Sequence, residues 1–378
     1  MRRASPAERE RLHETFASLC RIASPTGHER SCADYVATEL SRMGIEVAED
    51  EAGLAAGSNA GNLFARIEGT GERSIMLCAH MDTVPVTQEI EPVLVGDGWE
   101  NANDAILGAD NKAAVAVLLE LARRLRRAPA ARTMGLELVF TVAEETGLHG
   151  AKGFDVMRLR SQFGYVFDHA SPIGEVVVAS PTYQRIVAEL QGAAAHAGLR
   201  PEDGRSAIAA AARGIAAMRL GRIDAETTAN VGLITGGTAT NVVPERCHVE
   251  AEVRSLSEQR VEALLTEMID HLQDGADAGE CDLDVTAERM FSGYRTAPRA
   301  PQVALAERAL EACGYAPRRI ASGGGSDANA FIAAGFACTN LANGTERNHQ
   351  PDERVSTDAL EGMLEVAIAL VEEAADAA

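Results

Sequence analysis

Residues 74–83 constrain the fold more than any other stretch, because a short apolar run there ends in two chemically active side chains. Ile75–Ala79 has the length and composition of a strand that is buried on both faces. His80 and Asp82 follow it, and since side chains alternate along a strand, they point the same way. The pattern predicts either a metal site with an oriented imidazole or a capping aspartate beside a satisfied core histidine.

Two later apolar runs also end in acids. Gly135–Val142 is followed by Glu144 and Glu145, and Gly164–Phe167 is followed by Asp168. Neighbouring side chains at a strand end face opposite ways, so one carboxylate can bind a metal while the other serves as a general base. An ordinary surface pair of glutamates is the structural alternative. Open α/β sheets place their sites at such carboxyl ends, which favours the functional interpretation.

Two loops supply further candidate ligands. Asp110 lies within Gly108–Lys112, directly before an apolar helix. An N-cap explains an aspartate there, but a carboxylate with two oxygens can also bridge two cations. His349 precedes the last helix and offers a second imidazole, unless it is a loop histidine without a role.

The length of 378 residues exceeds the usual size of one hydrophobic core, so we expect two domains. Strands alternate with helices over residues 1–176, and this pattern resumes over 289–378, which predicts a doubly wound, mostly parallel α/β catalytic domain. Between them, residues 177–288 follow the order β–α–β–β–α–β of a ferredoxin-like split βαβ fold. We expect an inserted α+β domain there, with Glu175–Ser180 as its extra leading strand.

Charge and cysteine usage narrow the class of protein. A formal net charge of −21 argues against nucleic acid or an anionic membrane as partner, because both would be repelled. No apolar stretch is long enough to span a bilayer. The cysteines are dispersed without any C-x-x-C pair, which predicts reduced thiols and a cytoplasmic protein. They stand at positions 20, 32, 78, 247, 281, 313 and 338.

A glycine loop, Ser322–Asp327, precedes a short helix. Such a loop brings backbone N–H groups close to a ligand. No Walker lysine follows it, so we reject a nucleotide phosphate site.

Taken together, the motifs resemble those of the M20 family of dinuclear zinc peptidases, over about residues 12–372. Within that family they look most like the peptidase T and peptidase-T-like group of tripeptide aminopeptidases. The motifs that carry the resemblance are, in chain order, His80-Met81-Asp82-Thr83, Gly108–Lys112, Glu144 and Glu145 before Gly147, Asp168, His196-Ala197-Gly198, Asn241, Arg254, Gly323–Asp327 and His349.

The resemblance implies a cofactor of two Zn²⁺ ions, with Co²⁺ or Mn²⁺ as substitutes. One ion would be held by His80 and Asp168 and the other by Glu145 and His349, with Asp110 bridging them. This set leaves a coordination position free for water, as catalytic zinc requires.

The same resemblance implies the catalytic roles. Glu144 would be the general base that takes a proton from the metal-bridging water and returns it to the leaving amine. Asp82 would orient the His80 imidazole through its other nitrogen. Glu353, four positions after His349, stands where the family also has a glutamate.

Substrate binding is expected from the inserted domain and the glycine loop. His196 would stabilise the oxyanion, and Asn241 would hold the substrate backbone. Arg254 would pair with a substrate carboxylate, although a salt bridge to a surface glutamate is its structural alternative. Gly324 and Ser326 complete the predicted substrate-binding set.

We therefore expect an enzyme that hydrolyses an amide bond in small peptides, foremost a tripeptide or dipeptide aminopeptidase. An N-acyl-amino-acid amidohydrolase or a carboxypeptidase could use the same site with a different pocket. A metal-dependent peptide-binding module without activity is disfavoured, because Glu144 is present. The inserted domain is expected to act as a lid and as the surface of a homodimer.

Overall fold

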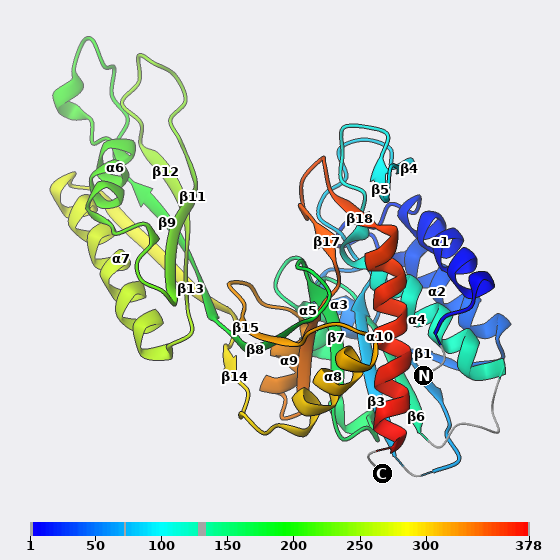
Figure 1. The fold of residues 1–378 in the computed structure, drawn as a ribbon. Coiled ribbons are helices and arrows are strands. Elements are labelled where there is room, and N and C mark those ends of the chain that lie inside the picture. Colours follow the sequence, from blue (N-terminus) through cyan, green and yellow to red (C-terminus); the bar gives the residue numbers. More distant parts are fainter. Residues whose placement is uncertain (1–2, 72, 128–133, 377–378) are drawn as a thin grey trace. The chain divides into compact units, whose positions relative to one another are not determined.

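The computed structural model describes residues 3–71, 73–127 and 134–376. The chain forms two compact units (Figure 1). The first unit comprises Met1–Val178, Thr296–Ala321 and Ser326–Ala378, and the second comprises Ala179–Arg295 and Ser322–Gly325. Each unit has its own cluster of buried apolar side chains.

A large mixed sheet forms the centre of the first unit, and this confirms the predicted α/β class. Its middle strands run parallel, whereas the outer pairs are antiparallel. The order across the sheet is β1 (Val47–Glu49), β2 (Leu63–Ile67), β6 (Gly135–Thr141), β3 (Ser74–His80), β7 (Gly164–His169), β16 (Cys338–Ala342), β8 (Glu175–Ser180) and β14 (Tyr294–Arg295), with β15 (Arg318–Ala321) paired to β8.

Helices cover both faces of this sheet. Ile75, Leu77 and Ala79 of β3 alternate into one core, and α4 (Ala109–Arg127) packs against that strand. Cys78 faces the other way, and its sulfur lies 3.8 Å from Asp327, the first residue of α9. The α4 group also contains α1 (Pro6–Cys20), α2 (Arg30–Arg42), α8 (Pro301–Ala312) and α10 (Thr357–Asp376), and the α9 group contains α3 (Ala52–Ala56) and α5 (His149–Gly153).

The parallel strands β6, β3, β7 and β16 end at the same edge of the sheet. His80 pairs in register with Thr141, and Ala342 with His169. Because parallel strands share a direction, the residues that follow them emerge together. The first unit therefore brings the candidate ligands at the ends of β6, β3 and β7 to one edge of the sheet.

A small sheet lies beside the large one in the first unit. Its strands are β17 (Thr345–Glu346), β18 (Arg354–Ser356), β5 (Gly98–Asn101) and β4 (Pro92–Val95), in that order. The turn that carries His349 connects β17 to β18, so this sheet anchors the loop of that ligand.

The second unit is an antiparallel sheet with helices on one face, which confirms the predicted split βαβ architecture. Ile186, Ala188, Val249 and Ala251 alternate into its core beneath the two helices. The sheet order is β10 (Gly221–Arg222), β11 (Thr227–Gly236), β12 (Arg246–Ser255), β9 (Thr182–Gln191) and β13 (Asp282–Phe291), and the helices are α6 (Ala207–Ala217) and α7 (Glu258–Ala278).

Two expectations about the insertion need correction. Glu175–Ser180 is not a leading strand of the small sheet, because it pairs with β16 and β14 in the large one. The last strand of the insertion, β13, runs to Phe291, past the predicted boundary at residue 288, since its ladder with β9 extends to Tyr183. Within the described residues, no helix combines the length and the apolarity needed to cross a bilayer.

Candidate metal centre

His80 ends β3 as a fully buried imidazole with both nitrogens engaged. Its Nδ1 lies 3.0 Å from the backbone carbonyl of Asp82. Its Nε2 lies 3.2 Å from Asp110 Oδ1 and 3.6 Å from Asp168 Oδ1. An Nδ1–H bond to a carbonyl fixes the tautomer of a ligating histidine, so Nε2 is the atom available to a metal.

Asp82 is buried behind His80 and holds the turn that follows β6. Its Oδ1 accepts from the Glu144 N–H at 3.0 Å, and its Oδ2 accepts from the Glu145 N–H at 3.2 Å and from the Thr26 hydroxyl at 2.7 Å. The same carboxylate lies 3.4 Å from His80 Nδ1. Asp82 thus lies against the imidazole and also holds the backbone of two neighbouring acidic residues, which its sequence position did not reveal.

Asp110 lies between the two imidazoles. Its Oδ1 faces His80, and its Oδ2 lies 3.3 Å from His349 Nε2. That histidine nitrogen is also 3.1 Å from Glu145 Oε1. Asn348 donates its side-chain N–H to Asp110 Oδ2 at 2.8 Å, a contact that no sequence pattern indicated. The arrangement gives Asp110 the geometry of a bridging ligand.

The donor atoms form groups that suit two cations. Within each of three groups the ligand atoms lie within 4.8 Å of one another, and two of these groups share Asp110. Glu145 Oε1 is buried and makes no hydrogen bond, although His349 Nε2 is only 3.1 Å away. A buried carboxylate oxygen without a hydrogen bond, next to an imidazole nitrogen, fits a pair of atoms that would bind the same cation. The groups are His80, Asp110 and Asp168; Asp110, Glu145 and His349; and His80, Glu144 and Glu145.

The carboxylates of the site lie close together and are buried, and this shifts their pKa values. Burial, together with the charge of Asp168, raises the pKa of Glu144 well above its usual range. Burial and the charge of Asp110 raise the pKa of Asp168 to about 8. Asp110 differs from these two acids, because contacts with His349 and His80 outweigh its burial and hold its pKa below the usual range. So many buried acids need positive charge nearby if all are to ionise.

The imidazoles respond to the same crowding. Burial lowers the pKa of His80, but contacts with Asp110 and Asp168 more than offset this and raise it well above the usual value. Contacts with Asp110 and Glu145 raise the pKa of His349 to about 10. Without metal, protons on the two histidines therefore supply the positive charge that offsets the carboxylates. Two divalent cations can supply this charge instead.

Comparison with known proteins assigns the sequence to a family. The sequence pattern of peptidase family M20/M25/M40 matches residues 76–373. The chain belongs to this family. Its members depend on metal ions, and the donor set described above fits that requirement.

Individual relatives of this M20 peptidase cover nearly its whole length. It is 36% identical over 367 residues to the uncharacterised protein YqjE of Bacillus subtilis, covering 97% of this chain and 99% of that one. The structure of the aminopeptidase PepT from Bacillus cereus shares 37% identity with a TM-score of 0.84, covering 97% and 98% of the two chains. A tripeptidase from Staphylococcus aureus shares 32% identity with a TM-score of 0.90, covering 97% and 99%. The chain is therefore a peptide-bond hydrolase with peptidase-T-like relatives.

The glycine loop of the M20 peptidase makes structural contacts. Ser326 is the buried N-cap of α9 and forms a capping box with Asn329. The Gly324 carbonyl accepts from the Ser180 hydroxyl at 2.9 Å, and the Gly324 N–H donates to Ser322 Oγ at 3.0 Å. These contacts account for both residues without a ligand, so substrate binding by either stays a prediction.

In the second unit, His196 and Asn241 lie on neighbouring exposed segments. His196 forms an isolated bridge with Val242, and the Asn241 carbonyl accepts from the Ala197 N–H at 2.9 Å. The Gly198 N–H donates to His196 Nδ1 at 3.2 Å. Backbone pairing thus places the two residues predicted to contact the substrate on adjacent segments.

Arg254 lies elsewhere, near the end of β12. Its Nε and Nη2 donate to the two carboxylate oxygens of Glu252 at 3.1 and 3.0 Å. The guanidinium carbon lies 4.1 Å from the centre of the Tyr183 ring. The alternative of a salt bridge to a nearby glutamate is therefore realised, and it occupies part of the group predicted to bind a substrate carboxylate.

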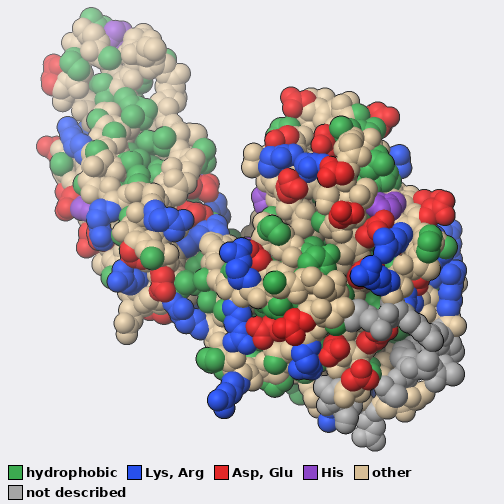
Figure 2. Space-filling model, in the orientation of Figure 1, with side chains coloured by type: hydrophobic (Ala, Val, Ile, Leu, Met, Phe, Trp, Pro, Cys, Tyr) green, Lys and Arg blue, Asp and Glu red, His purple; other side chains and the backbone are tan. Residues whose placement is uncertain are grey.

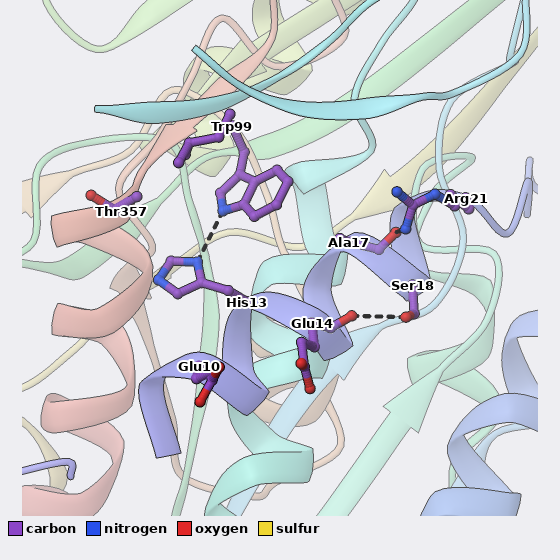
Figure 3. Close-up of a pocket in the computed structure, with 9 residues that line it drawn as sticks. Glu10, His13, Glu14, Ala17, Ser18, Arg21, Trp99 and Thr357 are labelled. Atoms are coloured by element: carbon purple, nitrogen blue, oxygen red, sulfur yellow. Dashed lines mark hydrogen bonds between the residues drawn. The ribbon is translucent and has the colours of Figure 1, made fainter. Parts of the chain in front are cut away.

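A separate hollow of about 730 Å³ lies between α1 and the β4–β5 hairpin (Figure 3). Trp99 Nε1 donates to His13 Nδ1 at 2.9 Å on its wall. Among the described residues that line this hollow, none belongs to the predicted site. The carboxylate and imidazole cluster of the M20 peptidase does not line this hollow.

Proposed function

We propose that this M20 peptidase is a two-metal aminopeptidase that releases the N-terminal residue of short peptides, with tripeptides foremost. The observation that carries the proposal is the pair of ligand groups that share Asp110, with Glu144 beside them. The near full-length similarity to an aminopeptidase and a tripeptidase supports the substrate class.

The metal ligands follow from the two groups. His80 and Asp168 would hold one Zn²⁺, Glu145 and His349 the other, and Asp110 both. When bound, two such ions acidify a water molecule and polarise the scissile carbonyl. Co²⁺ and Mn²⁺ accept the same mixture of imidazole and carboxylate ligands.

Glu144 is suited to the proton transfers. Its backbone N–H is held by Asp82 at 3.0 Å, so the side chain starts from a fixed position. Its pKa is raised by burial, which makes it a stronger base than an exposed glutamate. The carboxylate accepts a proton from the attacking water as the new C–O bond forms. It then gives this proton to the amine nitrogen as the C–N bond breaks, leaving a carboxylate and an amine.

The second unit is proposed to bind substrate through His196 and Asn241 and to serve as a lid. These side chains are exposed and lie on paired segments, so they can approach an extended peptide without losing buried contacts. Arg254 would recognise a substrate carboxylate with the donors that Glu252 leaves free.

We also propose that a second copy of the chain pairs with the edge of β11. Strand β10 covers only Thr228 and Ala229 of that edge, and Leu233 and Ile234 are 43% and 47% exposed. Figure 2 shows hydrophobic side chains exposed among charged ones on the second unit. An open edge with apolar side chains favours strand pairing between chains. Leu233→Lys with Ile234→Lys should convert a dimer to a monomer in light scattering, and a wild-type monomer would refute this proposal.

The location of the protein is proposed from its thiols. The seven cysteines, all within the described residues, are free. Free thiols of this number are typical of reducing compartments, so we propose a cytoplasmic enzyme.

A panel of tripeptides with free and blocked termini tests the proposed activity. We expect cleavage to require a free amino group and to survive amidation of the C-terminus. Cleavage that survives N-acetylation but is lost on amidation would instead identify a carboxypeptidase or an N-acyl-amino-acid amidohydrolase.

Zinc titration of chelated enzyme should restore activity at about two equivalents, and saturation at one would contradict the shared Asp110.

A further inference from the structure

Glu353 is a buried acid that the proposed chemistry does not use. It lies directly before β18, and its side chain is 1% exposed. Its Oε2 accepts from the N–H groups of Leu107 at 2.9 Å and Gly108 at 2.8 Å. Its Oε1 accepts from the Asp110 N–H at 2.9 Å. One carboxylate therefore satisfies three backbone donors of the segment that carries the shared ligand.

These donors have no alternative partner within a regular helix. Gly108 has φ +75°, and Asp110 has φ −83° and ψ 105°, both outside helical geometry. Successive N–H groups in such a loop converge on a concave point that favours an anion. Leaving buried N–H groups unpaired is costly, so the position of the loop depends on the anion that fills this point.

The loop that carries Glu353 contacts both the backbone and the side chain of Asp110. Glu353 holds its backbone, while Asn348 donates to its Oδ2 at 2.8 Å. His349, in the same loop, lies 3.3 Å from that oxygen. A displacement of residues 107–110 would therefore turn the Asp110 carboxylate away from one imidazole or the other.

We propose that Glu353 is a positioning residue for Asp110, which fixes the backbone so that the carboxylate faces His80 and His349 at once. The proposal rests on the two-metal site proposed above and deepens it. A glutamine cannot replace the acid, because its single carbonyl oxygen leaves an NH₂ group directed at one of the backbone donors.

Metal affinity of Glu353→Gln is the direct test, with Co²⁺ as the probe. The full-length protein is stripped with a chelator, and the dissociation constants are measured by chelator competition. We expect 10–100-fold weaker binding and an altered Co²⁺ absorption spectrum. Asn348→Ala removes the second contact and should weaken binding in the same direction, but less.

Glu137→Gln provides a matched control. Glu137 is also fully buried and accepts from the N–H groups of Arg160 and Ser161, but it lies near the amino end of β6. This variant makes the same chemical change away from the ligands. It should lower the melting temperature while the Co²⁺ dissociation constants stay within about twofold of wild type.

The outcomes distinguish a role in positioning Asp110 from a general contribution to the stability of the fold. Wild-type Co²⁺ affinity in Glu353→Gln would overturn the proposal, as would equal weakening in Glu137→Gln. If Glu353→Gln does not fold, Glu353→Asp keeps the charge but shortens the reach, and it must then show weakened Co²⁺ binding or the proposal fails. The readout does not involve peptide cleavage, so an unexpected substrate would refute the proposed aminopeptidase without affecting this result.

Discussion

The two units of the chain present their predicted site residues in opposite ways. In the first unit, His80, Asp110 and Asp168 are buried or nearly so, and each contacts another predicted residue. In the second unit, His196 and Asn241 are exposed, and their contacts are made with their own loops. The difference follows from electrostatics, because a buried charge must have a partner whereas an exposed polar group has water. Candidate metal ligands can therefore be recognised from their contacts within one unit. Exposed residues that would contact only a substrate cannot be recognised in this way.

The contrast implies different results for substitutions in the two units. Changes in the first unit should alter metal binding or the chemical step, since the groups are already assembled. Changes in the second unit should alter substrate affinity. The predictions below test this division, beginning with the largest expected effect.

Glu144→Gln should have the largest effect on turnover. The substitution keeps the size of the side chain and its backbone hydrogen bond to Asp82, but it removes the proton acceptor. We expect kcat to fall by about 10²–10⁴ while two metal ions remain bound, measured by kinetics and metal analysis. Retained turnover would remove Glu144 as the base, and lost metal would make it a ligand, as its group with His80 and Glu145 also allows.

Metal binding should depend steeply on pH. Contacts with carboxylates raise the pKa of His349 to about 10 and the pKa of His80 well above its usual value, so both rings are protonated at neutral pH without metal. Ligation needs neutral imidazoles and an ionised Asp168, whose pKa is raised to about 8. Filling both positions near neutral pH should therefore release about two to three protons, and overall affinity should fall at least ~100-fold per unit of pH decrease. Calorimetry in buffers of different ionisation enthalpy measures this release.

The raised histidine pKa values also change how the stability of the metal-free protein depends on pH. A histidine pKa that is raised on folding stabilises the protein fully below the ordinary histidine pKa, and this contribution is lost as the pH rises through about 10 for His349. Metal binding without proton release would contradict the ligand assignment of both imidazoles.

Asp82→Ala should have an intermediate effect. It leaves the buried N–H groups of Glu144 and Glu145 without their acceptor, while His80 Nδ1 keeps the backbone carbonyl at 3.0 Å. We expect a 10–100-fold loss of metal affinity together with a lower melting temperature. Thr26→Val removes only one donor to the same carboxylate and should change affinity much less. Equal effects of the two variants would mean that Asp82 acts through Thr26 rather than through the turn.

The candidate ligands could be proposed from the sequence because their signal is local. His80 and Asp168 stand at the ends of apolar strands, and parallel strands bring such ends together whatever the details of packing. The supporting acids carry no local signal. Glu29 accepts from the Ala143 N–H at 3.1 Å and Glu353 from the segment before α4, and both partners are backbone groups distant in sequence.

Three further structural features depend on different physical causes. Glu175–Ser180 has strand composition, but the sheet it joins depends on which neighbour offers a free edge. The partner of Arg254 could have been predicted, because Glu252 lies two positions earlier and thus on the same face of the strand. Ser326 likewise stands three residues before Asn329, the spacing of a capping box.

Arg254→Met should have the smallest effect, confined to substrate affinity. Glu252 already occupies Nε and Nη2, so only the remaining donors can serve a substrate carboxylate. We expect KM for free tripeptides to rise by up to about tenfold with kcat unchanged, and KM for C-amidated peptides to stay the same. Glu252→Gln should have the opposite effect on free tripeptides, because it releases the guanidinium fork. A large fall in kcat in Arg254→Met would break the division between the units and place Arg254 among the groups that act on the reacting bond.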